Sequence, residues 1–184
     1  MIIVGITGTL GAGKGTIVEY LIKNKGFKHF SVRQFLIEEI NKKGLPVNRD
    51  SMTEVANNLR ANHSPSFIIE QLYKKAIAEG GNAIIESIRT PGEVEFLKKQ
   101  GKFYLIAVDA DPKVRYNRIS IRGSETDHIT FETFLANEKR EFTAYDPNKQ
   151  NLSRCIQLAD IVLQYDGTID ELNNSLEEKL IKII

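Results

Sequence analysis

The sequence has little of what marks secreted or membrane proteins. Its 184 residues include one cysteine, Cys155, and no segment approaches the roughly 20 apolar residues of a membrane span. A single cysteine excludes an internal disulfide and fits a reducing compartment, and Cys155 is expected to be a small core residue on a helix. The apolar run at the N-terminus is too short for a signal peptide and has no basic residues before it. We therefore expect a cytoplasmic protein without a membrane partner.

An excess of charge of one sign is also missing. The chain carries 25 Lys and Arg against 24 Asp and Glu, which gives a formal net charge of +1. This balance provides no field to steer nucleic acid or an anionic membrane, and no run of Lys or Arg points to either partner. Internal repeats, low-complexity segments and long linkers are absent as well. We expect one domain over residues 1–184, large enough to bury its own core, and no nucleic-acid partner.

What is present is a glycine-rich stretch over residues 8–16, with the sequence Gly-Thr-Leu-Gly-Ala-Gly-Lys-Gly-Thr. It follows the apolar run 2–6 and precedes residues 17–22, which have helical spacing, and this is the context of a phosphate-binding loop. Glycines permit positive φ, successive N–H groups form a nest for an anion, and the helix N-terminus adds partial positive charge. The stretch predicts binding of ATP by Gly8, Leu10, Gly11, Ala12, Gly13, Lys14, Gly15 and Thr16, with Lys14 as a mobile charge for the β- and γ-phosphates.

One position departs from the strict pattern of such loops. Ser or Thr normally follows the lysine and binds Mg²⁺ through its hydroxyl, whereas here Gly15 holds that place and Thr16 comes next. Thr16 is shifted by about 100° around the helix, so it is a weak metal ligand that still reaches a phosphate. We expect Mg²⁺ to keep most of its waters, which suits an ion that dehydrates reluctantly.

Apolar runs that alternate with helical patterns predict the fold class. Strands are expected over residues 2–6, 27–30, 82–86, 103–109 and 161–165, with helices between them and a closing helix over 169–184. This alternation indicates an α/β protein with a doubly wound, five-stranded parallel sheet. Ligands bind at the carboxyl ends of the strands in such sheets. The phosphate loop, Glu86, Ser87, Arg89 and Asp109 are therefore expected along one edge.

The pattern Gly-x-x-Gly-x-Gly-Lys-Gly-Thr resembles the loop of adenylate kinase and other nucleoside monophosphate kinases, including the deoxynucleoside monophosphate kinases. The resemblance implies a three-layer P-loop kinase domain with an acceptor-binding insert at about 31–80 and a short lid at about 118–142. The start of the chain and the segment 159–167 also resemble dephospho-coenzyme A kinase. The likeness spans nearly the whole chain but is specific only in the loop and, to a lesser degree, at residues 86–89 and 118–122.

The segment after the third strand carries the second resemblance. Glu-Ser-Ile-Arg-Thr-Pro, at residues 86–91, is similar to the Asp-Gly-x-Pro-Arg-Thr of adenylate kinase, with Glu86 in place of Asp and no proline before Arg89. By this resemblance Glu86 holds Mg²⁺ through water and Arg89 grips the phosphate of the acceptor, for which a bidentate guanidinium is well shaped. The plain alternative is a carboxylate at the strand end that pairs with Arg89.

Arg115, Arg118 and Arg122 recur at helical spacing, so one helix face carries three guanidiniums. Arg118 and Arg122 match the Arg-x-x-x-Arg that begins the lid in nucleoside monophosphate kinases, and the resemblance implies that they neutralise the transferring group. An arginine in this role is worth roughly 10³ to 10⁵ in rate. Arg115 and Arg140 are further lid candidates. The alternative for the whole set is a solvated basic face.

The acceptor segment departs most from the family. In Ser-Val-Arg-Gln-Phe-Leu, residues 31–36, Gln34 stands at the position of an acid, and Ile37 replaces an arginine that binds phosphate. Arg33 or Arg60 must then hold the acceptor together with Arg89. For Arg33 and Arg60, an exposed polar residue without a role in binding is at least as good an explanation.

The function that follows is an ATP-dependent kinase that uses Mg²⁺ and acts on a nucleoside or deoxynucleoside monophosphate, with Lys14, Arg89, Arg118 and Arg122 as catalytic residues. No general base is needed, because a phosphate oxygen is already ionised at neutral pH. Two alternatives stay open. Transfer to a ribose hydroxyl, as in dephospho-coenzyme A kinase, needs a base, and a nucleotide-dependent switch or assembly ATPase needs no acceptor.

Overall fold

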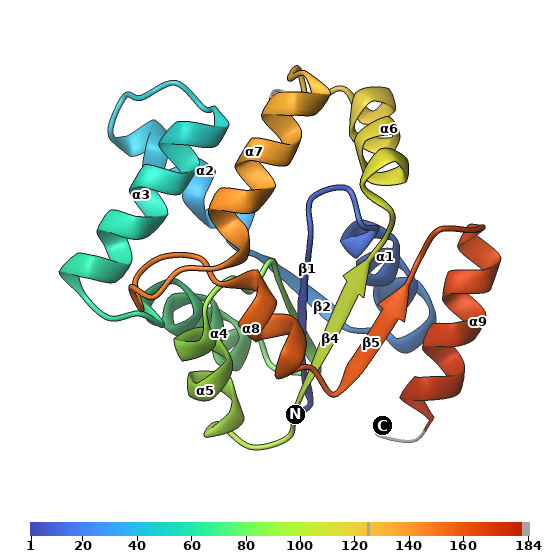
Figure 1. The fold of residues 1–184 in the computed structure, drawn as a ribbon. Coiled ribbons are helices and arrows are strands. Elements are labelled where there is room, and N and C mark those ends of the chain that lie inside the picture. The colour runs from blue at the N-terminus through green and yellow to red at the C-terminus, as the bar shows by residue number, and fades with distance from the viewer. Residues whose placement is uncertain (125, 182–184) are drawn as a thin grey trace.

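The computed structural model describes residues 1–124 and 126–181, and a five-stranded sheet forms its centre (Figure 1). The strands are paired in parallel throughout, in the order β2-β3-β1-β4-β5. Their bounds are β1 Ile3–Gly8, β2 Lys28–Ser31, β3 Ala83–Glu86, β4 Phe103–Asp109 and β5 Ile161–Gln164. The α/β class and the five-stranded parallel sheet predicted from the sequence are confirmed.

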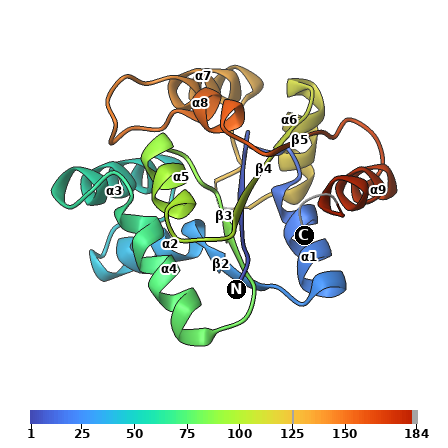
Figure 2. The ribbon, with the colours of Figure 1, turned by 90° about the horizontal axis from the view of Figure 1, so that it is seen from below.

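Helices cover both faces of the sheet, as Figure 2 shows from below. One face carries α1 (Lys14–Lys25) and α9 (Ile169–Leu180), and the other carries α4 (Phe67–Glu79), α5 (Pro91–Lys98) and α8 (Leu152–Gln157). The remaining helices stand around the carboxyl ends of the strands: α2 (Val32–Lys42), α3 (Arg49–Asn62), α6 (Pro112–Arg122) and α7 (Phe131–Phe142). Within the described part of the chain, no helix combines the length and apolar character needed to cross a bilayer.

The alternating side chains of β1 divide the core into two layers. Val4 and Ile6 pack toward α1 and α9, whereas Ile3 packs toward α4, α5 and α8. Gly5 leaves room on that second side, because a Cβ there would lie 2.6 Å from Cδ1 of Ile88. A strand that is buried on both faces in this way reads as a continuous apolar run, which is why the sequence predicts it well.

Helix ends follow local signals. Ser31 caps α2 by accepting a hydrogen bond from the Gln34 N–H, Asp111 caps α6, and Gly26 ends α1 with φ 68°. The start of α3 is also fixed by a local signal. Asn48 is the cap, and Ser51 is the third helical residue of a capping box.

Two further expectations concern α8 and the C-terminus. Cys155 is fully buried on α8, as expected for a small core residue. The closing helix ends at Leu180, before the 184 that the sequence suggested. The expected positions 182–184 lie outside the described residues.

Candidate functional site: a cationic cavity over the phosphate loop

The loop between β1 and α1 is built on glycines that no other residue can replace without strain. Gly8, Gly11 and Gly13 have φ of 137°, 79° and 103°. A Cβ would lie 2.0 Å from the Val108 carbonyl oxygen at Gly8, and 2.5 Å from the Tyr165 ring at Gly13. At Gly15 a Cβ would meet nothing within 4 Å. Crowding therefore does not explain why this position lacks the Ser or Thr that normally follows the lysine.

Lys14 is buried at the first turn of α1 and turns its ammonium group back onto the loop. Nζ donates hydrogen bonds to the carbonyl oxygens of Gly8 at 3.0 Å and Thr9 at 2.7 Å. Burial, together with the charge of Arg89, lowers the pKa of Lys14 to about 7, although Glu86 and Glu141 oppose the shift. A polyphosphate beside Nζ would favour the charged form again.

The carboxylate of Glu86 lies at the end of β3. His29 Nε2 is 3.3 Å from one of its oxygens, and the Ser87 hydroxyl donates to the other at 2.8 Å. Burial raises the pKa of Glu86, but the hydrogen bond with His29, the charge of Lys14 and the Ser87 hydroxyl outweigh it and bring the pKa to about 2. Glu86 is thus ionised at neutral pH. It is not paired with Arg89, so the plain alternative for this segment does not hold.

Ser87 follows with φ 71°, which is rare for a residue other than glycine. Its N–H and that of Ile88 both donate to the Ile6 carbonyl oxygen, at 2.9 and 3.1 Å. These two bonds fix the turn that carries the chain from β3 into the cavity. A strained residue of this kind is often found at a ligand site.

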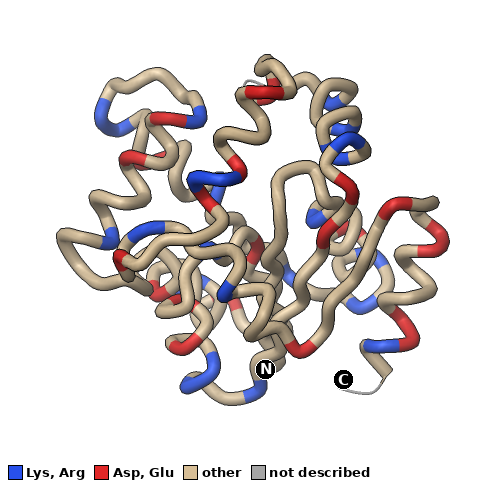
Figure 3. The backbone as a smooth tube through the Cα atoms, in the orientation of Figure 1, with Lys and Arg blue, Asp and Glu red and all other residues tan. Residues whose placement is uncertain are grey.

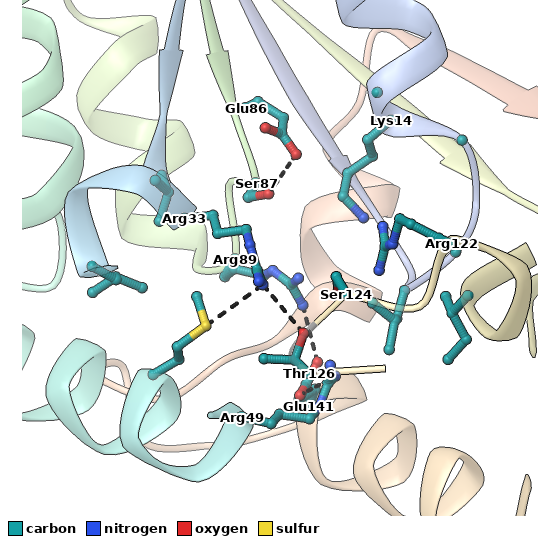
Figure 4. Close-up of a pocket in the computed structure, with 18 of the residues that line it drawn as sticks. Lys14, Arg33, Arg49, Glu86, Ser87, Arg89, Arg122, Ser124, Thr126 and Glu141 are labelled. Atoms are coloured by element: carbon teal, nitrogen blue, oxygen red, sulfur yellow. Dashed lines mark hydrogen bonds and ion pairs between the residues drawn. The ribbon is translucent and has the colours of Figure 1, made fainter. Parts of the chain in front are cut away.

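A cavity of about 590 Å³ joins the phosphate loop to the helices α2 and α3. Figure 4 shows Lys14, Arg89 and Arg122 directed into it. On the side of α2 and α3 its apolar wall consists of Val32, Leu36, Met52 and Ala56. Its cationic lining consists of Lys14, Arg33, Arg49, Arg60, Arg89, Arg118 and Arg122.

The two predicted lid arginines reach the cavity from α6. The Arg118 guanidinium lies 3.8 Å from the centre of the Tyr165 ring, and its buried Nη1 has no hydrogen-bond partner among the described residues. Arg122 donates to both carboxylate oxygens of Asp127, at 2.7 and 2.8 Å. The hydrogen bond with Asp127 raises the pKa of Arg122. Arg118 thus has a donor to spare, whereas Arg122 is held by a carboxylate.

Three other predicted arginines are engaged with carboxylates. Arg115 is buried, is paired with Glu138 and is not among the described residues that line the cavity. Arg140 is half-exposed, lies 3.5 Å from Asp50 and is also outside that lining. Arg60 lines the cavity, but its Nε and Nη2 donate to Glu93 at 3.0 and 2.8 Å.

The cavity is also lined by Arg33 of α2, Arg49 of α3 and Arg89, which follows β3. Arg33 Nη1 donates to the Thr126 hydroxyl at 3.3 Å. Glu141, near the end of α7, accepts from Arg49 at 2.5 Å and from Arg89 at 3.0 Å. Burial lowers the pKa of Arg49, and the charge of Glu141 opposes this shift.

The comparisons with known proteins fit this geometry. The family model described as "AAA domain" matches residues 4–145. The UPF0200 protein of Methanococcus vannielii is 30% identical over 190 residues, which cover 100% of this chain and 99% of that protein. The chain belongs to the UPF0200 family and carries this AAA domain. The UPF0200 protein of Sulfurisphaera tokodaii is 29% identical over 182 residues, which cover 99% of this chain and 97% of that protein.

Solved structures show that this UPF0200 chain has a P-loop kinase-like fold. The TT1252 protein of Thermus thermophilus superposes with a TM-score of 0.61 at 18% identity, covering 100% of this chain and 98% of that one. A shikimate kinase from Bacteroides thetaiotaomicron gives 0.60 at 14% identity, covering 98% of each chain. A gluconokinase from Sinorhizobium meliloti gives 0.58 at 13% identity, covering 98% of this chain and 92% of that one.

Arg49 and Glu141 of the UPF0200 chain were not found by sequence reasoning. Glu141 ends the run Glu-Lys-Arg-Glu at 138–141, which has the composition of a solvated helix surface, yet its side chain is only 5% exposed. The one usable signal is the capping box at Asn48 and Ser51, because it places Arg49 in the first turn of α3. That signal fixes the helix start but does not predict what the Arg49 side chain meets.

Proposed function

We propose that the chain is an ATP-dependent kinase that transfers the γ-phosphate of ATP to the phosphate of a nucleoside or deoxynucleoside monophosphate. The observation that carries the proposal is one cavity whose cationic lining extends from the phosphate loop to α2 and α3. Lys14 and the loop residues line it on one side, Arg33 and Arg49 line it from α2 and α3, and Arg89 lies between them (Figure 4). Two charged groups that must react with each other need such an arrangement, since phosphoryl transfer depends on positioning and charge neutralisation.

On the donor side, the loop amides and Lys14 hold the β- and γ-phosphates of ATP, and Arg118 and Arg122 neutralise the group in transfer. Magnesium fits the residues present, because this ion binds through one or two carboxylates, phosphate oxygens and several waters. Glu86 would hold it through water, with Thr16 as a weaker ligand, and the ion would neutralise charge on the phosphates. The low pKa of Glu86, about 2, suits this role.

On the acceptor side, the carboxylates favour a phosphate over a hydroxyl. An alcohol must lose a proton to a base, whereas a phosphate oxygen is already ionised. The cavity lining contains three described carboxylates, Glu19, Glu86 and Glu141. Glu86 has a pKa of about 2 and Glu141 is bound by Arg49 and Arg89, so neither of these two is matched to proton abstraction near neutral pH. Glu19 is exposed on α1, the helix that follows the phosphate loop, and therefore belongs to the donor side. The apolar wall of α2 and α3 gives a base or sugar a surface to pack on.

The test is release of ADP from Mg-ATP with a panel of nucleoside monophosphates, deoxynucleoside monophosphates and dephospho-coenzyme A. We expect turnover to depend on one class of monophosphate. Lys14→Ala should cut this turnover by roughly 10² to 10³ or more while the protein still melts cooperatively, because one electrostatic donor is lost. Stimulation by dephospho-coenzyme A alone would show transfer to a hydroxyl. Equal ADP release with and without every acceptor would contradict the proposal and favour a switch.

A further inference from the structure

Glu141 is a carboxylate of the cavity lining that joins two arginines. Its Oε1 accepts from Arg49 at 2.5 Å and its Oε2 accepts from Arg89 at 3.0 Å. The three side chains are 5%, 16% and 17% exposed, and Figure 4 shows them converging from different elements. Arg49 comes from α3, Arg89 from the segment between β3 and α5, and Glu141 from α7.

This contact has the chemistry of anion recognition. A carboxylate that receives one guanidinium on each oxygen is bound as a phosphate can be bound, by a charge-assisted hydrogen bond from each arginine. Arg89 also donates to Gln150 at 3.1 Å, which holds its guanidinium in this orientation. The position that Glu141 fills is thus already organised for an anion.

We propose that Glu141 occupies the place of the acceptor's anionic group, and that a phosphate displaces it from Arg49 and Arg89 when the acceptor binds. The inference rests on the proposed function and deepens it in two ways. It assigns Arg49 to the acceptor site, and it names a phosphate dianion as the group that the site selects. A neutral acceptor cannot replace a carboxylate on two arginines, because both charges would then be left in a mostly buried site without a counter-ion.

The exchange also connects acceptor binding to the position of α7. A second pair, Arg140 with Asp50 at 3.5 Å, joins the same two helices at the neighbouring residues, but it is exposed to solvent and contributes little. The Glu141 contact with Arg49 is thus the principal charged link from α7 to α3. When a phosphate takes its place, α7 is released from α3.

The experiment measures binding of inorganic phosphate by isothermal titration calorimetry, with the phosphate loop filled by Mg²⁺ and a non-hydrolysable ATP analogue. Glu141→Gln keeps the shape of the side chain and removes the competing charge. We expect it to bind inorganic phosphate about tenfold more tightly than the wild type, or more, because a charge-assisted contact no longer has to be broken. Glu138→Gln is the matched control. It makes the same change one turn earlier on α7, where the carboxylate pairs with Arg115 outside the cavity lining, and it should change phosphate affinity less than about twofold.

Wild-type or weaker phosphate affinity in Glu141→Gln would overturn the inference, since Glu141 would then position the arginines rather than compete for them. Phosphate that binds neither form would overturn it as well. Should the Gln variant fail to fold, Glu141→Asp decides, because the shorter carboxylate reaches the arginines poorly and affinity should rise severalfold. The titration of the ATP analogue itself is run first. Its failure counts against the proposed function, and phosphate is then compared between the variants without the analogue.

Discussion

At the scale of single residues, some glycines in and after the phosphate loop are required by the backbone conformation, whereas one is not. Gly13 has φ 103° and packs against the Tyr165 ring, while Gly15 lies in α1 with open space where a Cβ would be. The sequence motif predicts that both glycines belong to the phosphate-binding site and does not distinguish them. The difference depends on Tyr165, which is far away in the sequence and is brought to the loop by β5.

The first prediction concerns these two glycines. Gly13→Ala should lower the free energy of unfolding by about 2 kcal/mol or more, because it combines a forbidden φ with a clash. Gly15→Ala should raise it by about 0.4–1 kcal/mol, because alanine reduces the conformational entropy of the unfolded chain and its Cβ would meet nothing within 4 Å. Urea unfolding of the nucleotide-free protein measures both changes. Equal effects of the two substitutions would contradict the positive φ of Gly13 and its contact with Tyr165.

At the scale of elements, the contacts of an arginine depend on which neighbouring helix supplies a carboxylate. Arg60 on α3 meets Glu93 of α5, and their side chains are 1% and 0% exposed. Glu93 in turn accepts from the N–H groups of Arg89 and Thr90 at the start of α5. The sequence predicts Arg60 as an acceptor ligand. Two of its nitrogens donate to Glu93, whereas its buried Nη1 has no hydrogen-bond partner among the described residues.

The second prediction follows from this pairing. Arg60→Ala should destabilise the protein by about 3–5 kcal/mol, because it leaves the Glu93 charge buried without its partner. Arg140→Ala, at the exposed pair with Asp50, is the control and should stay within about 0.5 kcal/mol of the wild type. Denaturant unfolding gives both values. An Arg60→Ala protein of normal stability, with only a higher acceptor KM, would instead restore Arg60 to the acceptor site.

The elements also show what can be predicted from the sequence. Continuous apolar runs identify the buried strands, and Ser31, Asp111 and Gly26 mark helix ends by local chemistry. Glu86 is found because it follows a strand. Arg49 and Glu141 are not found, since their contact joins α3 to α7 and depends on how two helices are placed beside each other. Local sequence carries no trace of such a pairing.

At the scale of the whole molecule, the fold concentrates positive charge in one cavity, although the chain as a whole is almost neutral. Figure 3 shows basic and acidic residues along all parts of the chain in view, in keeping with the net charge of +1. The cavity nevertheless collects Lys14 and six arginines, because the loop after β1 and the segment after β3 end at the same edge and α2, α3 and α6 stand around it. The net charge of the chain therefore does not predict an anionic ligand, whereas the topology explains why basic side chains meet in one cavity.

The most direct test of the account is the number of protons taken up when ATP binds. The pKa of Lys14 is about 7 in the empty loop, so near pH 8 the amine is mostly neutral, and a bound polyphosphate should return it to the ammonium form. Calorimetric titrations near pH 8, in two buffers of different ionisation enthalpy, should show uptake of roughly one proton per ATP in the wild type. Uptake should diminish as the pH falls below 7, where Lys14 is already charged.

Lys14→Met should abolish the proton uptake and weaken ATP binding. The account would be contradicted by heats that are the same in both buffers for the wild type, or by a Lys14→Met protein that binds ATP as tightly as the wild type does.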